Sequence, residues 1–343
     1  MSYLLFKIIQ IIEQYSENMN VPKVTVLMTV YNGEKFLRKA VESVLGQTFE
    51  DFELLIINDG STDRTAEVLH GFQDPRVRIF GNRENLGVYH SANRGLKLAQ
   101  GEYVARIDAD DVALPRRVEE QVAYLDTHPD VGLVASAAEI IDENGLTVSV
   151  VNDVLSPEQI YYTLFFNNCI FHSSVMFRKG IALGIGGYDE TLKRASDFDL
   201  WSRMSTVSRI DCIREPLVKW RGSPTNMSTV FKNEQDDAAY RIFAKNIGGL
   251  MGKPIDVESI RCIHDDGLER CFSVSYDALL ELEKIQQQLL ESCPAWLEKD
   301  TLAAFCQQKM RHYVGIMLVH HQITDVLRLL RHARFRKLFL ELF

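Results

Sequence analysis

An acidic turn near residue 110 carries the densest group of chemically useful side chains. Asp108, Asp110 and Asp111 directly follow the apolar, strand-like residues 101–107. Carboxylates this close repel one another, and burying them is costly unless a cation or hydrogen-bond donors compensate their charge. A hard divalent cation such as Mn²⁺ or Mg²⁺ prefers oxygen ligands and often bridges to a bound phosphate. The turn is therefore a candidate metal site, with a solvated acidic loop as the alternative.

Polar clusters also follow two earlier strand-like runs. Thr29, Tyr31 and Asn32 end the first run, and Asp59 follows the second. In a parallel sheet these strand ends share one rim with the acidic turn, and open α/β sheets bind ligands at that rim. A carboxylate such as Asp59 can accept the imide N–H of uracil, and the Tyr31 ring can stack on a base. A plain turn with a helix cap is the alternative for Asp59.

No glycine-rich phosphate loop accompanies these clusters. The first strand-like run is not followed by G-x-G-x-x-G, and G-x-x-x-x-G-K-[ST] occurs nowhere in the chain. We therefore expect a nucleotide site here to hold its phosphates through a metal, which again points to Asp108 and Asp110.

The hydrophobic pattern alternates between short and long segments up to about residue 138. Runs rich in β-branched residues predict strands at residues 24–30, 52–57, 77–80, 101–108 and 132–138. Apolar residues at helical spacing predict helices at residues 34–45, 62–72, 91–99 and 115–128. This alternation is typical of an α/β fold with a mostly parallel sheet flanked by helices.

The remainder of the chain has a different pattern. Residues 146–226 are mixed, with a strand expected at 174–177 and a helix at 197–205, and strand signals fade after residue 231. Helices are expected at residues 276–290 and 301–330. We therefore predict three regions: an N-terminal amphipathic helix (residues 1–20), an α/β domain (residues 21–230) and a helical C-terminal region (residues 231–343).

The composition argues against several classes of protein. A net charge of −9 provides no electrostatic attraction to nucleic acid, so no nucleic-acid partner is expected. The six cysteines form no C-x-x-C pair, which favours reduced thiols over disulfides or a zinc site. The N-terminal apolar run is interrupted by Lys7, Gln10 and Glu13 and lacks a small-residue cleavage site. We expect a cytoplasmic protein.

In their order and spacing, the polar clusters resemble one enzyme family. The carrying segments are residues 24–33, Asn58-Asp59-Gly60-Ser61-Thr62-Asp63, Asn85-Leu86-Gly87, Asn93-Arg94-Gly95, Asp108-Ala109-Asp110-Asp111, residues 172–178, Gly186-Gly187-Tyr188-Asp189 and Ser196-Asp197-Phe198-Asp199-Leu200-Trp201. From about residue 22 to 228, the chain resembles the family 2 glycosyltransferases of the GT-A fold. The resemblance implies inverting transfer of a sugar from a nucleotide-sugar donor, most often a UDP-sugar.

The resemblance implies which residues of the rim contact each part of the donor. The residues it implies at the nucleoside, or at the border of its pocket, are Thr29, Tyr31, Asn32, Asp59, Asn85 and Asn93. Asp110 would bind Mn²⁺ or Mg²⁺ on the diphosphate, and Asp108 would lie near the ribose or the sugar. Asp111 would support the donor or the metal from the same turn. A divalent ion there would stabilise the charge that develops on the leaving diphosphate.

Inversion also requires a base on the opposite face of the sugar, which takes the proton of the acceptor hydroxyl. The family places that base in a Glu-Asp pair ahead of an aromatic helix. Here the pair is Ser196-Asp197, so the first carboxylate is replaced and the resemblance assigns the base to Asp197. The alternative for Asp197 is a simple preference for negative charge in the first turn of a helix.

Two further residues are candidates through the same resemblance. His172 precedes the strand expected at 174–177, where the family keeps a histidine near the donor. A structural role is equally open for a lone histidine. Arg221 lies in the family's closing segment, where a basic residue often faces the diphosphate.

The last residues, 327–343, combine arginines and a lysine with leucines and phenylalanines at helical spacing. Such a basic amphipathic helix is typical of peripheral contact with an anionic membrane, and packing on the domain is the alternative. Family members of this kind often act on a glycan or on a lipid-linked or protein-linked saccharide, so these are the acceptors expected here.

Two other functions are alternatives to glycosyl transfer. A sugar-nucleotide nucleotidyltransferase can share a similar sheet, but it needs a glycine-rich basic loop after the first strand, and residues 31–35 match that loop poorly. A non-catalytic glycan-binding or nucleotide-binding relic would be indicated by loss of Asp110 or Asp197, and both are present.

Overall fold

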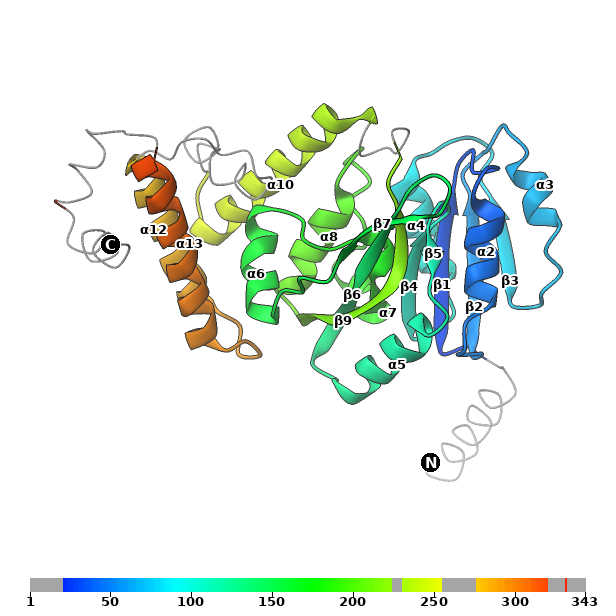
Figure 1. Ribbon diagram of the computed structural model, residues 1–343, viewed down its shortest axis with the longest axis horizontal. Helices are drawn as coiled ribbons and strands as arrows, with labels where there is room; N and C mark the ends of the chain where they lie inside the picture. Colours follow the sequence, from blue (N-terminus) through cyan, green and yellow to red (C-terminus); the bar gives the residue numbers. More distant parts are fainter. Residues whose placement is uncertain (1–20, 224–229, 255–275, 320–330, 332–343) are drawn as a thin grey trace, which may run out of the picture.

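The computed structural model describes residues 21–223, 230–254, 276–319 and 331. A curved central sheet with helices on both faces occupies one end of the molecule, and a group of helices occupies the other (Figure 1). This is the α/β architecture with a helical C-terminal region that the sequence predicts. The predicted helix at residues 1–20 and, apart from Arg331, the basic segment 327–343 lie outside the described residues.

The parallel half of the sheet carries the predicted ligand rim. Its strands are β3 (Val77–Gly81), β2 (Phe52–Asn58), β1 (Val24–Val30) and β4 (Tyr103–Asp108), in that spatial order. All seven residues of β1 are buried, as expected for a central parallel strand rich in β-branched residues. The register pairs Thr29 with Asp108 and Val30 with Asn58, so the polar residues that follow these strands start from one edge.

The other half of the sheet mixes strand directions. Its strands are β8 (Met176–Arg178), β6 (Val131–Ile141), β9 (Arg209–Arg221) and β5 (Val112–Ala113), with β7 (Thr147–Val151) paired on β6. Because β8 runs antiparallel to both β4 and β6, those two strands run in the same direction, as their alternation with helices predicts. The sequence gives no local sign that a later strand is inserted between them. The complete sheet is therefore mixed, and the strands that carry the rim are the parallel ones.

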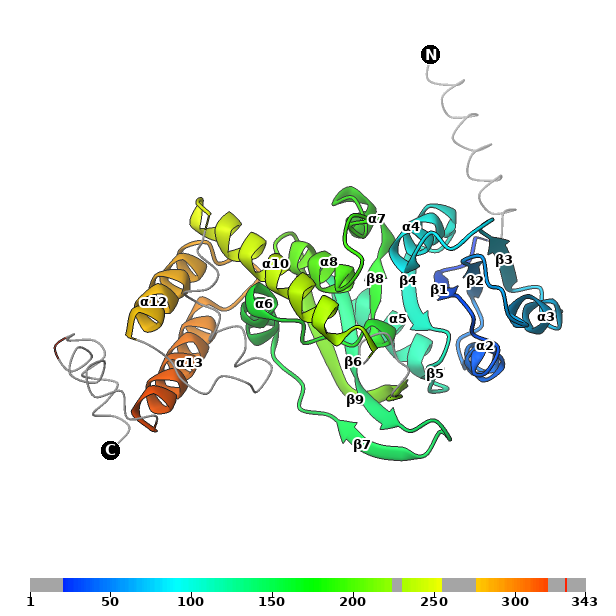
Figure 2. The same ribbon diagram turned by 90° about the horizontal axis from the view of Figure 1, so that it is seen from above.

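Alternate residues of the central strands face two different cores. Val26 and Met28 pack on one side with α2 (Leu37–Leu45) and α5 (Arg117–Thr127). Leu27 packs on the other side with α4 (Val88–Leu98) and α8 (Ser196–Ser205) (Figure 2). The buried residues of α2 are Leu37, Ala40, Val41 and Val44, an i, i+3, i+4, i+7 stripe. This two-sided packing fixes which strand residues reach the rim.

Two short helical segments complete this part of the chain. The helix α3 (Thr65–His70) is shorter than predicted because the Asp63 carboxylate accepts the backbone N–H of Thr65 and keeps the preceding residues in a turn. The helix α7 (Lys179–Gly184) follows β8 directly.

A separate helical core joins the C-terminal region to the sheet domain. Its helices are α6 (Pro157–Phe166), α10 (Lys232–Met251), α12 (Tyr276–Glu291) and α13 (Lys299–Val319). The helix α6 begins with a capping box between Ser156 and Gln159. Neighbouring residues of α10 enter different cores, since Ile242 packs with the sheet domain and Phe243 with the helical group. Across the residues described, no helix combines the length and apolar character needed to cross a bilayer.

Candidate active site

The first carboxylate of the acidic turn is held by basic partners. Asp108 forms an ion pair with Arg106 at 3.1 Å and lies 3.3 Å from Nδ1 of His172. Its backbone N–H donates to Ser173 Oγ at 3.0 Å, so the turn is tied to the segment before β8. Burial opposes the charged carboxylate, but His172 and Arg106 outweigh it and hold the pKa of Asp108 below its usual value.

Arg106 brings several predicted site residues together. This residue of β4 is fully buried, and its guanidinium donates to the Leu27 carbonyl at 2.8 Å and to the Thr29 hydroxyl at 3.3 Å. It also donates to Asp108 and, from Nε, to His172 Nε2 at 3.3 Å. The sequence interpretation did not assign Arg106. An arginine inside an otherwise apolar strand was the available signal, because a buried guanidinium needs partners for its five N–H groups.

Asp110 is the carboxylate that the turn leaves uncompensated. Burial, with the adjacent charge of Asp108, raises the pKa of Asp110 to about 6. Within the described part of the chain, no other residue donates a hydrogen bond to its side chain. A carboxylate disfavoured by burial and by a like charge suits a divalent cation with oxygen ligands. The residue present at this position therefore fits the metal that the family resemblance implies.

The protein alone does not supply a complete metal cage. Among the residues that the structure describes, no group of three or more histidine, cysteine, aspartate or glutamate side chains is arranged to hold an ion. An ion at Asp110 would need further oxygen ligands from a bound diphosphate and from water, as is usual for Mg²⁺ at phosphate sites.

Asp111 and Arg221 shape the acidic turn from inside. Asp111 is buried, and its carboxylate accepts the backbone N–H of Arg221 at 2.7 Å. Burial and the neighbouring carboxylates raise the pKa of Asp111. The Arg221 guanidinium donates to the carbonyls of Asp110 at 2.8 Å and Asp142 at 2.7 Å, and it lies over the Phe36 ring. These contacts are made with the chain itself, whereas the resemblance places both residues toward the donor.

The part of the rim predicted to bind the nucleoside combines an exposed ring with an engaged carboxylate. The Tyr31 side chain is 47% exposed, which leaves its ring available for stacking. Asp59 is buried and accepts hydrogen bonds from Asn82 Nδ2 at 2.7 Å and from the backbone of Leu86 and Gly87 at 3.0 and 2.9 Å. A carboxylate offers about four acceptor positions, so these contacts leave Asp59 about one position for a ligand.

Two backbone conformations hold the loops beside Asp59. Asn32 adopts a left-handed φ of 51°, and its side-chain oxygen accepts the Thr62 backbone N–H at 2.8 Å. Asparagine tolerates this conformation better than most residues. Gly60 has a φ of 69°, and a Cβ there would lie 2.4 Å from the backbone of Glu84. The loops after β1 and β2 and the loop at 82–87 are therefore locked together at the rim.

The two asparagines predicted at the pocket border differ in their contacts. Asn93 is buried, donates to the Tyr188 carbonyl and to Glu190 at 2.8 Å each, and accepts the Tyr188 N–H at 2.9 Å. Both amide hydrogens are thereby used to hold the loop that carries Tyr188. Asn85 is exposed, and its side-chain oxygen accepts the Gly87 N–H at 3.0 Å.

The predicted base lies in the first turn of α8. The helix begins after Ala195, which has a left-handed φ of 56°. Ser196 is fully buried and donates to the Asp189 carbonyl at 3.1 Å, so its hydroxyl is directed to the preceding loop. The Asp197 carboxylate accepts a hydrogen bond from Asn168 Nδ2 at 3.0 Å. Asn168, like Arg106, was not assigned from the sequence.

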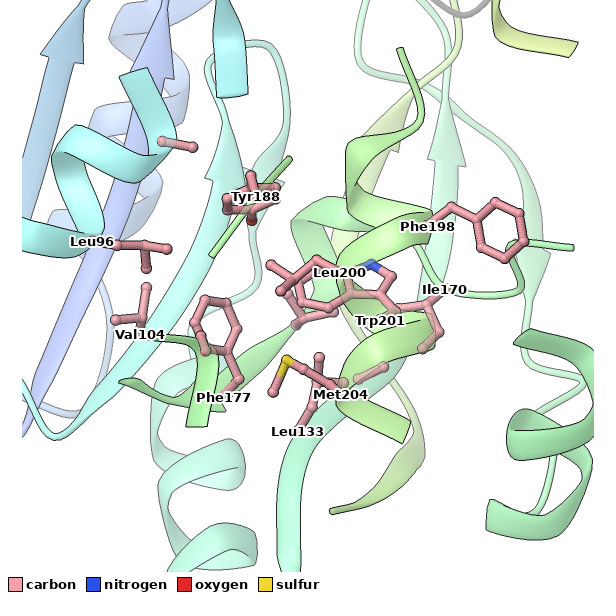
Figure 3. Packing of buried hydrophobic residues seen from close by; sticks show 14 of the residues in the cluster. Leu96, Val104, Leu133, Ile170, Phe177, Tyr188, Phe198, Leu200, Trp201 and Met204 are labelled. Carbon is pink, nitrogen blue, oxygen red and sulfur yellow. The ribbon is translucent and has the colours of Figure 1, made fainter. Parts of the chain in front are cut away.

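A buried tyrosine, Tyr188, lies next to His172 beside the acidic turn. The Tyr188 hydroxyl lies 2.9 Å from His172 Nε2, and its ring packs with Phe177 and the fully buried Trp201 in one hydrophobic cluster (Figure 3). Burial raises the pKa of Tyr188; Arg106 acts in the opposite direction, and the charges of Asp197 and Asp108 raise it further. Both carboxylates therefore act electrostatically on one phenol.

Part of the predicted site thus comes together. Thr29, Asp108 and His172 meet at Arg106, and His172 also contacts the Tyr188 hydroxyl. A sheet rim with a nucleoside side, an uncompensated carboxylate and a separate carboxylate at a helix start is suited to binding a phosphorylated nucleoside and transferring a group from it.

Comparison of the sequence with protein families gives one match in this region. Residues 25–183 match the family described as Glycosyl transferase family 2. An uncharacterized glycosyltransferase of Haemophilus influenzae is 30% identical over 291 residues, which span 77% of this chain and 88% of that protein. An uncharacterized glycosyltransferase of Methanocaldococcus jannaschii is 35% identical over 209 residues, 59% of this chain and 72% of that protein.

Solved structures share the same fold. The structure of S. aureus TarS 1–349 in complex with UDP-GlcNAc superposes with a TM-score of 0.58 over 88% of this chain and 92% of that chain, at 18% identity. The corresponding complex with UDP gives a TM-score of 0.54 at 20% identity, over 88% of this chain and 91% of that one.

Proposed function

This chain belongs to glycosyl transferase family 2, and from that premise we propose that it transfers a sugar, with inversion, from a UDP-sugar to a saccharide acceptor. The observation that carries the proposal is the buried network at the rim, in which Arg106 holds Thr29, Asp108 and His172, and His172 contacts the Tyr188 hydroxyl at 2.9 Å. The UDP and UDP-GlcNAc complexes of S. aureus TarS support a uridine donor.

The donor would lie along the rim of the parallel strands. The exposed Tyr31 ring would stack on the base, and the remaining acceptor position of Asp59 would take the imide N–H of uracil. Thr29 and Asp108 would approach the ribose or the sugar, with Asn32 and Asn85 shaping the loops beside them. His172 would border the sugar while it holds Asp108 and Tyr188.

Asp110 would hold Mn²⁺ or Mg²⁺ against the diphosphate. Such an ion, when bound, supplies positive charge to the leaving diphosphate. Asp111 and Arg221 would support this arrangement by fixing the backbone of the turn. Asn93 would act one step further away, through the loop that carries Tyr188.

Asp197 would be the general base on the acceptor side. It lies in the first turn of α8, where the helix N-terminus favours negative charge. The acceptor hydroxyl would give its proton to Asp197 as its oxygen attacks the anomeric carbon. A glycan or a lipid-linked or protein-linked saccharide is the acceptor class proposed, and peripheral membrane contact through the basic residues 327–343 would suit a lipid-linked one.

Release of the nucleotide product tests the proposal. The full chain would be incubated with a panel of nucleotide sugars, Mn²⁺ and candidate saccharide acceptors, with nucleoside diphosphate as the readout. UDP release from one UDP-sugar, dependent on the acceptor, is the expected result. Pyrophosphate formed from a sugar phosphate and UTP would identify a nucleotidyltransferase instead, and binding without turnover would identify a non-catalytic protein.

A pair of variants separates donor binding from transfer. Asp197→Asn keeps the size of the side chain but removes the base, so UDP should bind as in the unmodified protein while transfer falls about 100-fold or more. Retention of near-full transfer activity would show that Asp197 is not the base. Asp110→Asn is the matched comparison, and it should lose metal-dependent UDP binding.

A further inference from the structure

The carboxylate of Asp197 receives a specific hydrogen bond from outside its own helix. Asn168, in the loop that follows α6, donates from Nδ2 to Oδ2 of Asp197 at 3.0 Å. In the parts of the chain that the structure describes, no other side chain donates to this carboxylate. One carboxylate oxygen is thus held, and the other is left without a described partner.

The orientation of the Asn168 amide follows from its other contacts. Its Oδ1 accepts the backbone N–H of Ile170 at 3.1 Å, and its own backbone N–H donates to Asn167 Oδ1 at 2.8 Å. Because the Ile170 N–H can only donate, the oxygen of the amide must face Ile170. The NH₂ group must therefore face Asp197, and the loop itself presets the donor.

The neighbouring Ser196 does not take this role. Its hydroxyl donates to the Asp189 carbonyl at 3.1 Å, and the residue is fully buried. The position that holds a second carboxylate in the family resemblance is therefore directed to a loop, away from the base. Two tyrosines, Tyr89 of α4 and Tyr188, also interact with the charge of Asp197, and burial raises the pKa of each.

We propose that Asn168 is a positioning residue for Asp197. Its N–H fixes Oδ2, so that Oδ1 faces the acceptor hydroxyl. In the step, the hydroxyl proton moves to Oδ1, the acceptor oxygen forms a bond to the anomeric carbon, and the bond from that carbon to the diphosphate oxygen breaks with its electron pair on the leaving group. The role rests on the proposed function, in which Asp197 is the base.

Asn168→Asp removes this contact. The new carboxylate keeps an acceptor for the Ile170 N–H but has no N–H for Asp197, and it places a like charge beside the base. We expect kcat to fall about 10- to 100-fold, with little change in the KM for the donor or in the urea midpoint. Asn167→Asp is the matched control, because it introduces the same charge one residue earlier and leaves the Asn168 donor in place.

A double-mutant cycle tests whether Asn168 acts through Asp197. In an Asp197→Asn background, adding Asn168→Asp should reduce kcat by less than about twofold further, because the group it positions is already gone. Full additivity of the two losses would overturn the proposal, as would an unchanged kcat in Asn168→Asp alone.

A readout independent of turnover checks the contact itself. The side-chain NH₂ resonance of Asn168, assigned by its absence in Asn168→Ala, should have a different chemical shift in Asp197→Asn, where the carboxylate that accepts its hydrogen bond is gone. An Asn168 resonance with the same chemical shift in the unmodified protein and in Asp197→Asn would refute the contact. If the contact is present but no nucleotide sugar is turned over, the proposed function fails, and the positioning role is overturned with it.

Discussion

Arg106 donates from Nε to Nε2 of His172 at 3.3 Å, so the buried guanidinium and the imidazole meet beside the acidic turn. A guanidinium can only donate, so Nε2 is the acceptor in this contact. The other ring nitrogen, Nδ1, lies 3.3 Å from the Asp108 carboxylate. The Tyr188 hydroxyl lies 2.9 Å from Nε2. His172 therefore connects the aromatic cluster to the acidic turn.

Arg106→Met should destabilise the protein strongly. The substitution leaves the Leu27 carbonyl, the Thr29 hydroxyl and the Asp108 carboxylate without their buried donor. Loss of one partner of a buried ion pair costs about 3–5 kcal/mol, and a fall of this size in the free energy of unfolding is expected from urea denaturation. Arg106→Lys retains the charge and should lower the free energy of unfolding by less. An Arg106→Met protein as stable as the unmodified one would contradict this role.

Asp110→Asn should remove the effect of metal on donor binding. In the unmodified protein, Mn²⁺ should tighten UDP binding because the burial-destabilised Asp110 carboxylate gains a cation. In the variant, calorimetric titration with UDP should give nearly the same affinity with and without Mn²⁺. Asp130→Asn, at an exposed surface pair with Arg209, is the control and should preserve the metal effect. Mn²⁺-enhanced binding that survives in Asp110→Asn would place the ion elsewhere.

Tyr31→Ala should weaken binding of the donor without altering the chemical step. Stacking of a base on an aromatic ring contributes about 1–3 kcal/mol, so the Kd for UDP should rise about 5- to 150-fold while kcat changes little. Tyr31→Phe keeps the ring and should bind UDP nearly as well as the unmodified protein. Equal UDP affinity in all three proteins would show that the exposed Tyr31 ring does not contact the base.

Asn93→Ala should affect stability more than donor affinity. The side-chain oxygen and both amide hydrogens form hydrogen bonds with Tyr188 and Glu190. Removal of the side chain therefore leaves the Tyr188 N–H and C=O without these partners. The free energy of unfolding should fall by about 1–3 kcal/mol. UDP affinity should change less than about threefold, in contrast to a residue that touches the donor. A large loss of UDP affinity with unchanged stability would show that Asn93 contacts the nucleotide instead.

Cys169 and Cys212 should resist alkylation near neutral pH. Burial raises the pKa of each thiol to about 12, so each is almost entirely protonated at pH 8. The thiolate is the reactive form, and its fraction at pH 8 is about one in ten thousand for a pKa of 12. Peptide mapping after brief iodoacetamide treatment should show both unlabelled in the native protein and labelled in urea. Rapid native labelling of Cys169 would show that the loop beside Asn168 is open.

The strand ends of the parallel half could be predicted from sequence because their signals are local. β-Branched runs mark β1, β2 and β4, and the polar residues that end them, such as Thr29 and Asp59, follow within a few positions. The insertion of β8 between β4 and β6 could not be predicted in this way. It depends on pairing between strands that lie far apart in the chain, and no propensity of Met176–Arg178 reports it.

The roles of individual polar residues divide in the same way, into those that the local sequence predicts and those that depend on the folded chain. Asp110 stands out already in the sequence, and the structure leaves it uncompensated. Asp111, Arg221 and Asn93 have the residue types that bind ligands, yet the structure shows them in contact with distant parts of the chain. Arg106 and Asn168 went unassigned because their partners, at Thr29, His172 and Asp197, come close only after folding.

By itself, the sequence determined the strand–helix alternation, the shared rim and the resemblance to a family of sugar transferases, since these depend on local propensity and on the order of motifs. Only the tertiary structure decided which rim side chains remain available and which satisfy the buried backbone. Every buried donor and acceptor needs a partner, and these partners are supplied across long sequence separations, as when Asp111 accepts the N–H of Arg221.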